Sequence, residues 1–171
     1  VVLLQLDEDV WHERQVLIDE IPSGTYHHGG RLKIGPDQKL YVTAGDASNP
    51  ELAQNKASLA GKILRVNLDG SIPQDNPFEN SMIYSSGHRN PQGLAWTPEG
   101  VMYATEHGQS ANDEVNEIKP GENYGWPDIE GAEKQDGLLT PLFTSGKDHT
   151  WAPSGVAYDQ DMLYVAALRG T

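Results

Sequence analysis

The sequence predicts an all-β protein organised as a β-propeller or a similar circular array. Short runs rich in Val, Ile, Leu and Tyr alternate with turns rich in Gly, Pro, Asp and Asn, which is the pattern of short strands. One strand–turn–strand segment occurs three times, and helical signals are scarce. Such a recurring unit is typical of propellers, because one unit cannot bury both faces of its own sheet.

The repeated segment covers residues 31–42, 93–104 and 155–164. Pro36 and Pro98 stand at equivalent turn positions of the first two copies, beside an acidic residue, and this combination suits a type I turn. A polar loop and a further strand follow each of these two hairpins, with the strand segments at residues 62–70 and 113–119. The repeat therefore predicts successive sheets of several strands each.

The remaining segments complete the predicted arrangement. Residues 1–6 and 163–168 are apolar and are predicted to be strands, whereas residues 51–60 are predicted to form a short helix that ends at Gly61. We expect one partial propeller domain over residues 1–171, with blade units at 1–26 (partial), 27–88, 89–150 and 151–171 (partial). About three blades are too few for a closed ring of four to eight. We therefore expect a longer protein, self-association, or an open arc.

Composition excludes several classes of function. The chain has 25 acidic and 12 basic residues, a formal net charge of −13, and no Cys. This charge argues against binding to nucleic acid or to anionic membranes. The lack of Cys excludes disulfides and thiolate chemistry. We also expect no membrane span, because no apolar run approaches the ~18 residues that one requires.

The loops before the repeated strands carry the candidate site. His27, Arg89 and Trp151 follow one another at intervals of 62 positions, so on a propeller they are expected to meet around one opening. A neutral imidazole takes up protons, a guanidinium stabilises negative charge, and an indole offers a flat wall to a sugar or a planar cofactor. Asp46, Asp113, Glu114 and nearby loop carbonyls are hard oxygen ligands of the kind that Ca²⁺ prefers.

Several motifs together resemble one family. The segments GGRLKIGPDQKLYVTAGD, GKILRVNLDGSIPQDNPF, GHRNPQGLAW, DEVNEI and NYGWP are similar to those of the soluble quinoprotein aldose dehydrogenases, the glucose/sorbosone dehydrogenase family. The resemblance implies a six-bladed propeller that binds pyrroloquinoline quinone (PQQ) beside Ca²⁺. It also implies oxidation of the anomeric hydroxyl of aldose sugars to lactones, an external electron acceptor, and a periplasmic or secreted location.

The resemblance also implies roles for individual residues. His27 matches the general base, Asp46 the residue that orients it, and Arg89 the residue that stabilises charge on the reduced quinone. The implied cofactor-binding residues are Arg89, Asn90, His107, Asp113, Trp151 and Arg169. Main-chain carbonyls of Gly108 and Gln109 match the ligands of the PQQ-bound Ca²⁺. Glu114 and Tyr124 match ligands of a further calcium.

Two other functions remain open from the sequence. The first is a non-catalytic propeller module that binds sugar or protein, since the family's chains are about twice this length. The second is a Ca²⁺-dependent lactonase or esterase, since other propellers use a central calcium for hydrolysis. The GHRNPQG motif favours the dehydrogenase. Trp126, which precedes Pro127, is predicted to belong to the core rather than to the site.

Overall fold

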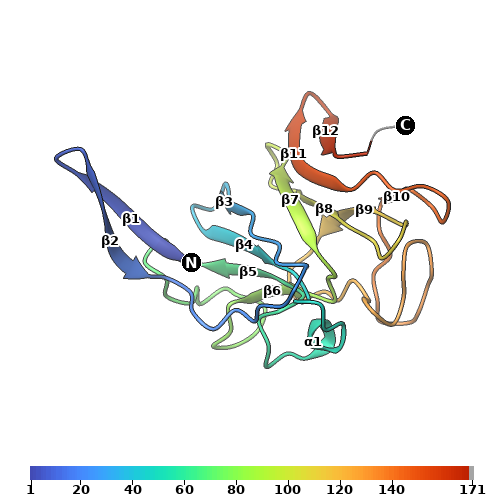
Figure 1. Cartoon of the computed structure of the whole chain (residues 1–171), viewed down its shortest axis with the longest axis horizontal. Helices are drawn as coiled ribbons and strands as arrows, with labels where there is room; N and C mark the ends of the chain where they lie inside the picture. The colour runs from blue at the N-terminus through green and yellow to red at the C-terminus, as the bar shows by residue number, and fades with distance from the viewer. Residues whose placement is uncertain (170–171) are drawn as a thin grey trace.

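The computed structural model of the chain describes residues 1–169. Its strands form four separate antiparallel sheets that follow one another along the chain (Figure 1). Two four-stranded sheets lie between two hairpins, so the all-β prediction is confirmed. Within residues 1–169, the structure contains no helix with the length and apolar character needed for a membrane crossing.

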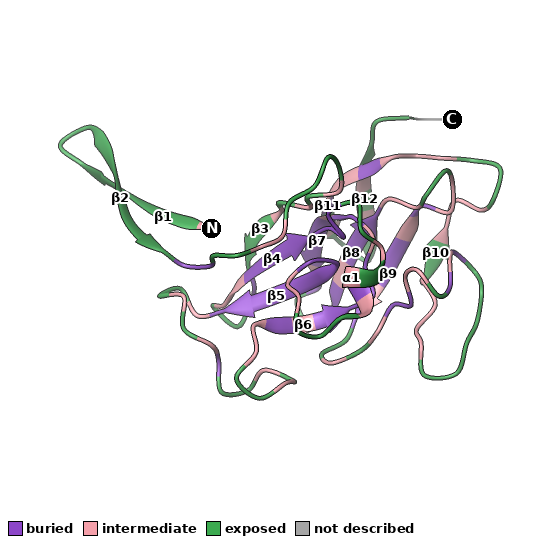
Figure 2. Cartoon of the chain, turned by 60° about the horizontal axis from the view of Figure 1, so that its bottom comes forward, coloured by how far each residue is buried: buried purple, intermediate pink, exposed green. Residues whose placement is uncertain are grey.

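The first hairpin pairs β1 (Val2–Asp7) with β2 (Val10–Val16). Glu8 and Asp9 form the turn, both with positive φ, as a two-residue hairpin turn requires. Both strands are exposed along their whole length, and Figure 2 shows this hairpin extending away from the rest of the chain.

The next sheet is a meander of β3 (Leu32–Ile34), β4 (Leu40–Ala44), β5 (Lys62–Val66) and β6 (Ile83–Ser86). The central strands β4 and β5 are almost entirely buried, whereas β3 is exposed. This meander contains the first copy of the repeated segment.

Between β4 and β5 lies α1 (Glu51–Gln54), a single turn. The predicted helix over 51–60 is therefore wrong in its length. Asn55 adopts an extended conformation, and its Oδ1 accepts a hydrogen bond from the Ala57 N–H at 2.9 Å. This local side-chain turn competes with the helix and ends it.

A second meander consists of β7 (Pro91–Trp96), β8 (Met102–Glu106), β9 (Glu114–Ile118) and β10 (Phe143–Thr144). A long loop, residues 119–142, separates β9 from the short strand β10. The last hairpin pairs β11 (Pro153–Asp159) with β12 (Met162–Ala167), and β11 lies against β7 and β8. The first strand of the last hairpin thus lies beside the first two strands of the second meander.

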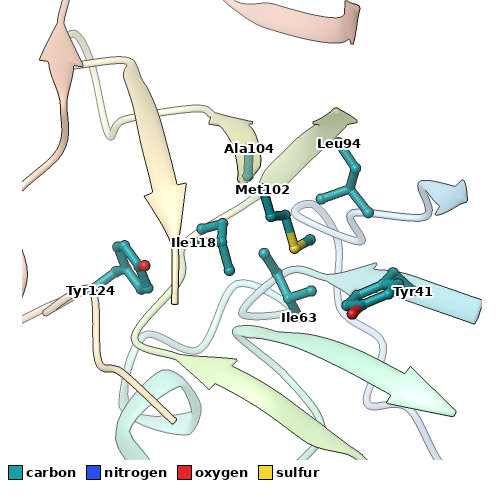
Figure 3. Close-up of a cluster of buried hydrophobic side chains, with 7 residues drawn as sticks. All are labelled: Tyr41, Ile63, Leu94, Met102, Ala104, Ile118 and Tyr124. Atoms are coloured by element: carbon teal, nitrogen blue, oxygen red, sulfur yellow. The ribbon is translucent and has the colours of Figure 1, made fainter. Parts of the chain in front are cut away.

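The core lies between the two meanders. Figure 3 shows Tyr41 and Ile63 of the first meander facing Leu94, Met102 and Ile118 of the second. Tyr41 also makes an edge contact with Trp96, with 5.1 Å between the ring centroids. Aliphatic and aromatic burial of this kind is the main favourable term in folding, so this cluster fixes the two sheets relative to each other.

Candidate active site

Three loops enter the first strands of three successive sheets, and these loops contain His27, Arg89 and Trp151. The first two loops are bonded through Gly29 and Asn90, and the loop after β4 bonds to the second of them through Asp46. The Asp46 N–H donates to the Arg89 carbonyl at 2.8 Å, and the Gly29 N–H donates to Asn90 Oδ1 at 3.1 Å. The loops that contain His27 and Arg89 are therefore adjacent, as the repeat spacing predicted.

His27 and Asp46 form a hydrogen-bonded pair. His27 Nδ1 lies 2.8 Å from Asp46 Oδ1, with 22% of the His27 side chain exposed and 1% of the Asp46 side chain. Asp46 Oδ1 also accepts from the Ser48 N–H at 2.8 Å. A carboxylate accepts hydrogen bonds, so Nδ1 carries a proton, and in the neutral ring Nε2 has a lone pair. Nε2 makes no hydrogen bond within residues 1–169.

The backbone brings this pair together at a very close approach. His27 has a positive φ of 62°, and its carbonyl accepts from the Ala47 N–H at 3.1 Å. A side chain at Gly45 would collide with the His27 carbonyl and touch Asn90 Oδ1. Glycine is therefore required at position 45 for the His27 loop to pack against Asp46.

Trp126 belongs to the same site, which corrects its assignment to the core. The Trp126 indole N–H donates to Asp46 Oδ2 at 2.9 Å. The Arg89 guanidinium carbon lies 5.4 Å from the Trp126 ring centroid, a cation–π distance. Sequence reasoning missed this because Trp126 lies 80 positions from Asp46 and outside the repeated segment. The NYGWP motif was the available signal.

Arg89 is partly buried and incompletely paired. Its Nη1 donates to the carbonyls of Gly108 at 2.6 Å and His107 at 3.2 Å. Its Nε is buried and has no hydrogen-bond partner within the described chain. Burial lowers the pKa of Arg89, and the negative charges of Asp46 and Glu106 act in the opposite direction. A buried donor without a partner fits an anionic ligand at this position.

A second histidine–carboxylate pair holds the backbone of Arg89 in place. His88 Nδ1 lies 2.8 Å from Glu106 Oε2, and His88 Nε2 lies 2.8 Å from Ser85 Oγ. Glu106 Oε1 accepts from the N–H groups of Arg89 and Asn90. The His88 side chain is completely buried. The sequence had not assigned His88, because burial is not visible in a polar motif.

Asn90 and His107 both tie the site loops together. Asn90 Oδ1 accepts from Gln92 Nε2 at 3.1 Å as well as from Gly29. His107 Nε2 lies 2.6 Å from the Pro153 carbonyl, which joins the end of β8 to the start of β11. The contacts of both predicted cofactor-binding residues within the described chain are thus structural ones.

Asp113 accepts hydrogen bonds from the loop that contains Trp151. Its Oδ1 accepts from the Gly108 N–H at 3.0 Å. Its Oδ2 accepts from Thr150 Oγ1 at 2.9 Å, from the Trp151 N–H at 2.5 Å and from the Ala152 N–H at 2.9 Å. Burial acts to raise the pKa of Asp113, but these hydrogen bonds outweigh burial and lower it. Asp113 therefore organises the loop instead of presenting a free carboxylate.

Trp151 and Arg169 lie together at the last hairpin. The Trp151 ring stacks on Phe143, with centroids 5.6 Å apart and an interplanar angle of 10°. The Arg169 N–H donates to the Trp151 carbonyl at 2.9 Å. Trp151 connects to the rest of the site through Asp113 and Gly108, rather than by a direct contact with Arg89 or His27.

Three of the predicted calcium ligands, Gly108, Glu114 and Tyr124, line a small cavity. Its lining includes Arg89, Glu106, Gly108, Glu114, Tyr124 and Trp126. Burial and the charge of Glu106, directly opposite on β8, raise the pKa of Glu114 to about 8. A cation between the two carboxylates would relieve this repulsion, and Ca²⁺ prefers such oxygen ligands. Gln109 is exposed nearby, with its N–H bonded to Glu130 Oε1 at 3.0 Å. No cluster of three or more His, Asp or Glu side chains able to hold a metal occurs within residues 1–169.

Comparison with known proteins points to one family. A sequence model described as glucose/sorbosone dehydrogenase matches residues 1–165. Quinoprotein glucose dehydrogenase B of Acinetobacter calcoaceticus is 46% identical over 143 residues, which are 71% of this chain and 30% of that protein. Aldose sugar dehydrogenase YliI of Escherichia coli is 39% identical over 107 residues, which are 59% of this chain and 29% of that protein.

The solved structures agree with the sequence relatives. The PQQ-bound form of aldose sugar dehydrogenase from Streptomyces coelicolor matches with a TM-score of 0.93 and 41% identity, over 99% of this chain and 52% of that one. This chain therefore spans about half the length of that structure and less of the curated relatives. The match confirms the predicted β-propeller fold, of which the chain forms a part.

Proposed function

Because the chain belongs to the glucose/sorbosone dehydrogenase family, we propose that it carries the base and the quinone-binding wall of a PQQ-dependent aldose dehydrogenase. The main support is the His27–Asp46 pair, which is joined through Trp126 to Arg89 and in which His27 Nε2 has no hydrogen-bond partner within residues 1–169. A proton acceptor is thus linked through Asp46 and Trp126 to a fixed positive charge. Oxidation of an alcohol by hydride transfer needs the first, and the second would stabilise charge on the reduced acceptor.

In the proposed reaction His27 is the general base. Its Nε2 accepts the proton of the anomeric hydroxyl, while the hydrogen on the same carbon leaves with its electron pair and the carbonyl of the lactone forms. Asp46 stabilises the imidazolium that results, because its Oδ1 stays bonded to Nδ1. An aldose is thereby oxidised by two electrons.

The cofactor would be held by the surrounding cationic and aromatic side chains. Arg89, through its unpaired Nε, is the best-supported contact, and Asn90, His107, Asp113, Trp151 and Arg169 stay predictions. When bound, PQQ supplies the two-electron acceptor that amino-acid side chains lack. Arg89 would stabilise negative charge on that acceptor, because a fixed cation has a large effect in a partly desolvated site.

Calcium is proposed at the carbonyls of Gly108 and Gln109 and, separately, at Glu114 and the Tyr124 carbonyl. The Gly108 carbonyl accepts from Arg89 in this structure and retains a second lone pair. The raised pKa of Glu114 supports a cation near its carboxylate. We further propose a periplasmic or secreted location and an external electron acceptor, in line with the family resemblance. Self-association also stays a prediction.

The test is exchange of the base in the full-length protein supplied with PQQ and Ca²⁺. His27→Gln is expected to lower reduction of an electron-accepting dye by glucose about 10²–10⁴-fold, because a positioned base contributes that much. His12→Gln, on the exposed strand β2, is the matched control and should leave turnover unchanged. Undiminished turnover of His27→Gln would place the base elsewhere. Lactone hydrolysis with calcium alone, without dye reduction, would favour the hydrolase.

A further inference from the structure

Trp126 lies at the junction of the two halves of the site. Its indole N–H donates to Asp46 Oδ2 at 2.9 Å. The Arg89 guanidinium carbon lies over its ring, 5.4 Å from the centroid. Asp46 follows β4 of the first meander, and Arg89 precedes β7 of the second. One side chain therefore contacts both the carboxylate partner of the base and the fixed cation.

The backbone of Trp126 is held from two sides. Its N–H donates to the Gly87 carbonyl at 3.0 Å, and its carbonyl accepts from Gln54 Nε2 at 2.6 Å. Gln54 lies in α1 and also exchanges hydrogen bonds with the Asn123 side chain at 2.7 and 3.2 Å. The indole is thus positioned by contacts that do not involve Asp46 or Arg89.

A buried lysine fixes the helix that carries Gln54. Lys62 Nζ donates to the carbonyls of Leu52, Ala53 and Ala60 at 2.7–2.8 Å, and the residue is fully buried. Two carbonyls of α1, those of Leu52 and Ala53, are thereby bonded to one ammonium group. Trp126 is therefore held through a continuous set of bonds from the interior of the first meander.

We propose that Trp126 is a positioning residue that fixes the Asp46 carboxylate and thereby the tautomer of His27. This proposal rests on the proposed function. Asp46 Oδ1 is bonded to His27 and to the Ser48 N–H, and Oδ2 is bonded to the indole. Without the indole, the buried Oδ2 lacks this donor and the carboxylate is free to rotate toward another one. His27 then loses the single orientation that presents Nε2 to a substrate.

Trp96 provides an internal comparison. Its ring also lies beside a cation, with Lys33 Nζ 5.7 Å from the centroid, and it packs on the core cluster between the two meanders. The structure records no hydrogen bond from Trp96 to a carboxylate within residues 1–169. Trp96→Phe is therefore a matched control for the loss of an indole that is packed but does not hold the base.

The experiment compares Trp126→Phe and Trp96→Phe in the full-length protein. Turnover is measured with PQQ and Ca²⁺, and ¹⁵N NMR of the histidine rings is measured on the cofactor-free protein. Trp126→Phe is expected to lower kcat about 10- to 100-fold with little change in KM, since small misplacements of a catalytic group have effects of this size. Its His27 spectrum should change from the Nδ1–H tautomer to a mixture. Trp96→Phe should retain the wild-type tautomer and kcat.

Two outcomes decide the proposal. A His27 that keeps the pure Nδ1–H tautomer in Trp126→Phe, with wild-type kcat, would overturn it. If Trp126→Phe does not fold, Gln54→Leu removes one support of the indole, and it should shift the tautomer and kcat in the same direction by a smaller factor. No shift in Gln54→Leu would then overturn the proposal. Because the NMR measurement needs no turnover, absence of dehydrogenase activity in the wild-type protein would reject only the proposed function.

Discussion

The chain contains two histidine–carboxylate pairs with the same bond length and different surroundings. His27 Nδ1 lies 2.8 Å from Asp46, and His88 Nδ1 lies 2.8 Å from Glu106. His27 is 22% exposed and its second nitrogen has no partner within residues 1–169, whereas His88 is fully buried and its second nitrogen bonds to Ser85. The bond to the carboxylate is thus common to both, and the second nitrogen distinguishes a candidate base from a structural clamp.

The buried pair has the order of groups found in a hydrolase triad. Ser85, His88 and Glu106 are linked in sequence by two 2.8 Å contacts, as a nucleophile, base and acid would be. Ser85 and His88 have no exposed surface, however, so no substrate reaches the hydroxyl. Glu106 instead holds the backbone of Arg89 and Asn90. The triad geometry therefore supports the site loop and gives no support to the hydrolase alternative.

The largest expected effect on stability is that of His88→Ala. The change removes one hydrogen-bond partner from Ser85 and one from Glu106 and leaves a buried carboxylate with less compensation, so we expect a loss of about 3–5 kcal/mol in the free energy of unfolding. His27→Ala, the matched variant of the other pair, should cost less than about 1 kcal/mol because its ring is partly hydrated. Urea unfolding measures both. Equal losses would erase the distinction between the two pairs.

Glu114→Gln is expected to change the pH dependence of the metal-free protein. The pKa of Glu114 rises from 4.5 to about 8 on folding, because of burial and the charge of Glu106. The favourable contribution of its protonated form is complete below pH 4.5 and is lost as the pH rises through 8. We therefore expect Glu114→Gln to gain about 2–3 kcal/mol relative to wild type between pH 5 and pH 8, less than the full shift because the side chain is partly exposed.

Urea unfolding at pH 5 and pH 8 with a chelator tests this, and Glu117→Gln on the same strand is the control, with 41% of its side chain exposed. Added Ca²⁺ should stabilise wild type at pH 8 more than it stabilises Glu114→Gln. If the unfolding free energy of Glu114→Gln depended on pH in the same way as that of wild type, the Glu114 carboxyl group would not be the source of this pH dependence.

The contrast between the two pairs shows what the sequence predicts and where it fails. The positions of His27 and Arg89 follow from the repeat, because equivalent loops enter neighbouring sheets at the same end. Trp126 and His88 could not be placed in this way. Trp126 is positioned by a long non-repeating loop, and the role of His88 depends on burial that only the packed sheets reveal.

Polar residues were harder to predict than apolar ones for a related reason. The resemblance marked Asn90, His107 and Asp113 as cofactor-binding residues, which stays a prediction, and the chain itself occupies many of their hydrogen-bonding atoms. A sequence shows which donors and acceptors are present, and the fold decides which of them are used internally. The helix over 51–60 failed similarly, because the Asn55 side chain formed a local turn.

Asp113→Asn extends the comparison to a carboxylate held by backbone donors instead of a histidine. One of the two oxygens becomes an NH₂ group that faces N–H or O–H donors, so we expect a loss of about 2 kcal/mol at neutral pH. The hydrogen bonds keep the pKa of Asp113 low against the effect of burial, so its contribution is present above pH 3.8 and is lost as the pH falls through the folded value.

The difference between Asp113→Asn and wild type should accordingly shrink in acid, which unfolding in urea at successive pH values measures. Asp148→Asn, an exposed residue near the same loop, is the control. A difference that stays constant down to the acid limit would mean that the charge of Asp113 does not contribute to holding the Trp151 loop.

Ser85→Ala is the smallest and most specific test of the buried clamp. The exchange removes the hydroxyl that bonds to His88 Nε2 and leaves the His88–Glu106 bond in place, so we expect a loss of about 1 kcal/mol. Ser23→Ala, at an exposed position, should have no measurable effect. In the double variant Ser85→Ala/His88→Ala, the total loss of stability should be smaller than the sum of the losses of the two single variants, because both changes remove the same bond. Full additivity would show that Ser85 does not support His88, and the difference between the two histidines would then rest on burial alone.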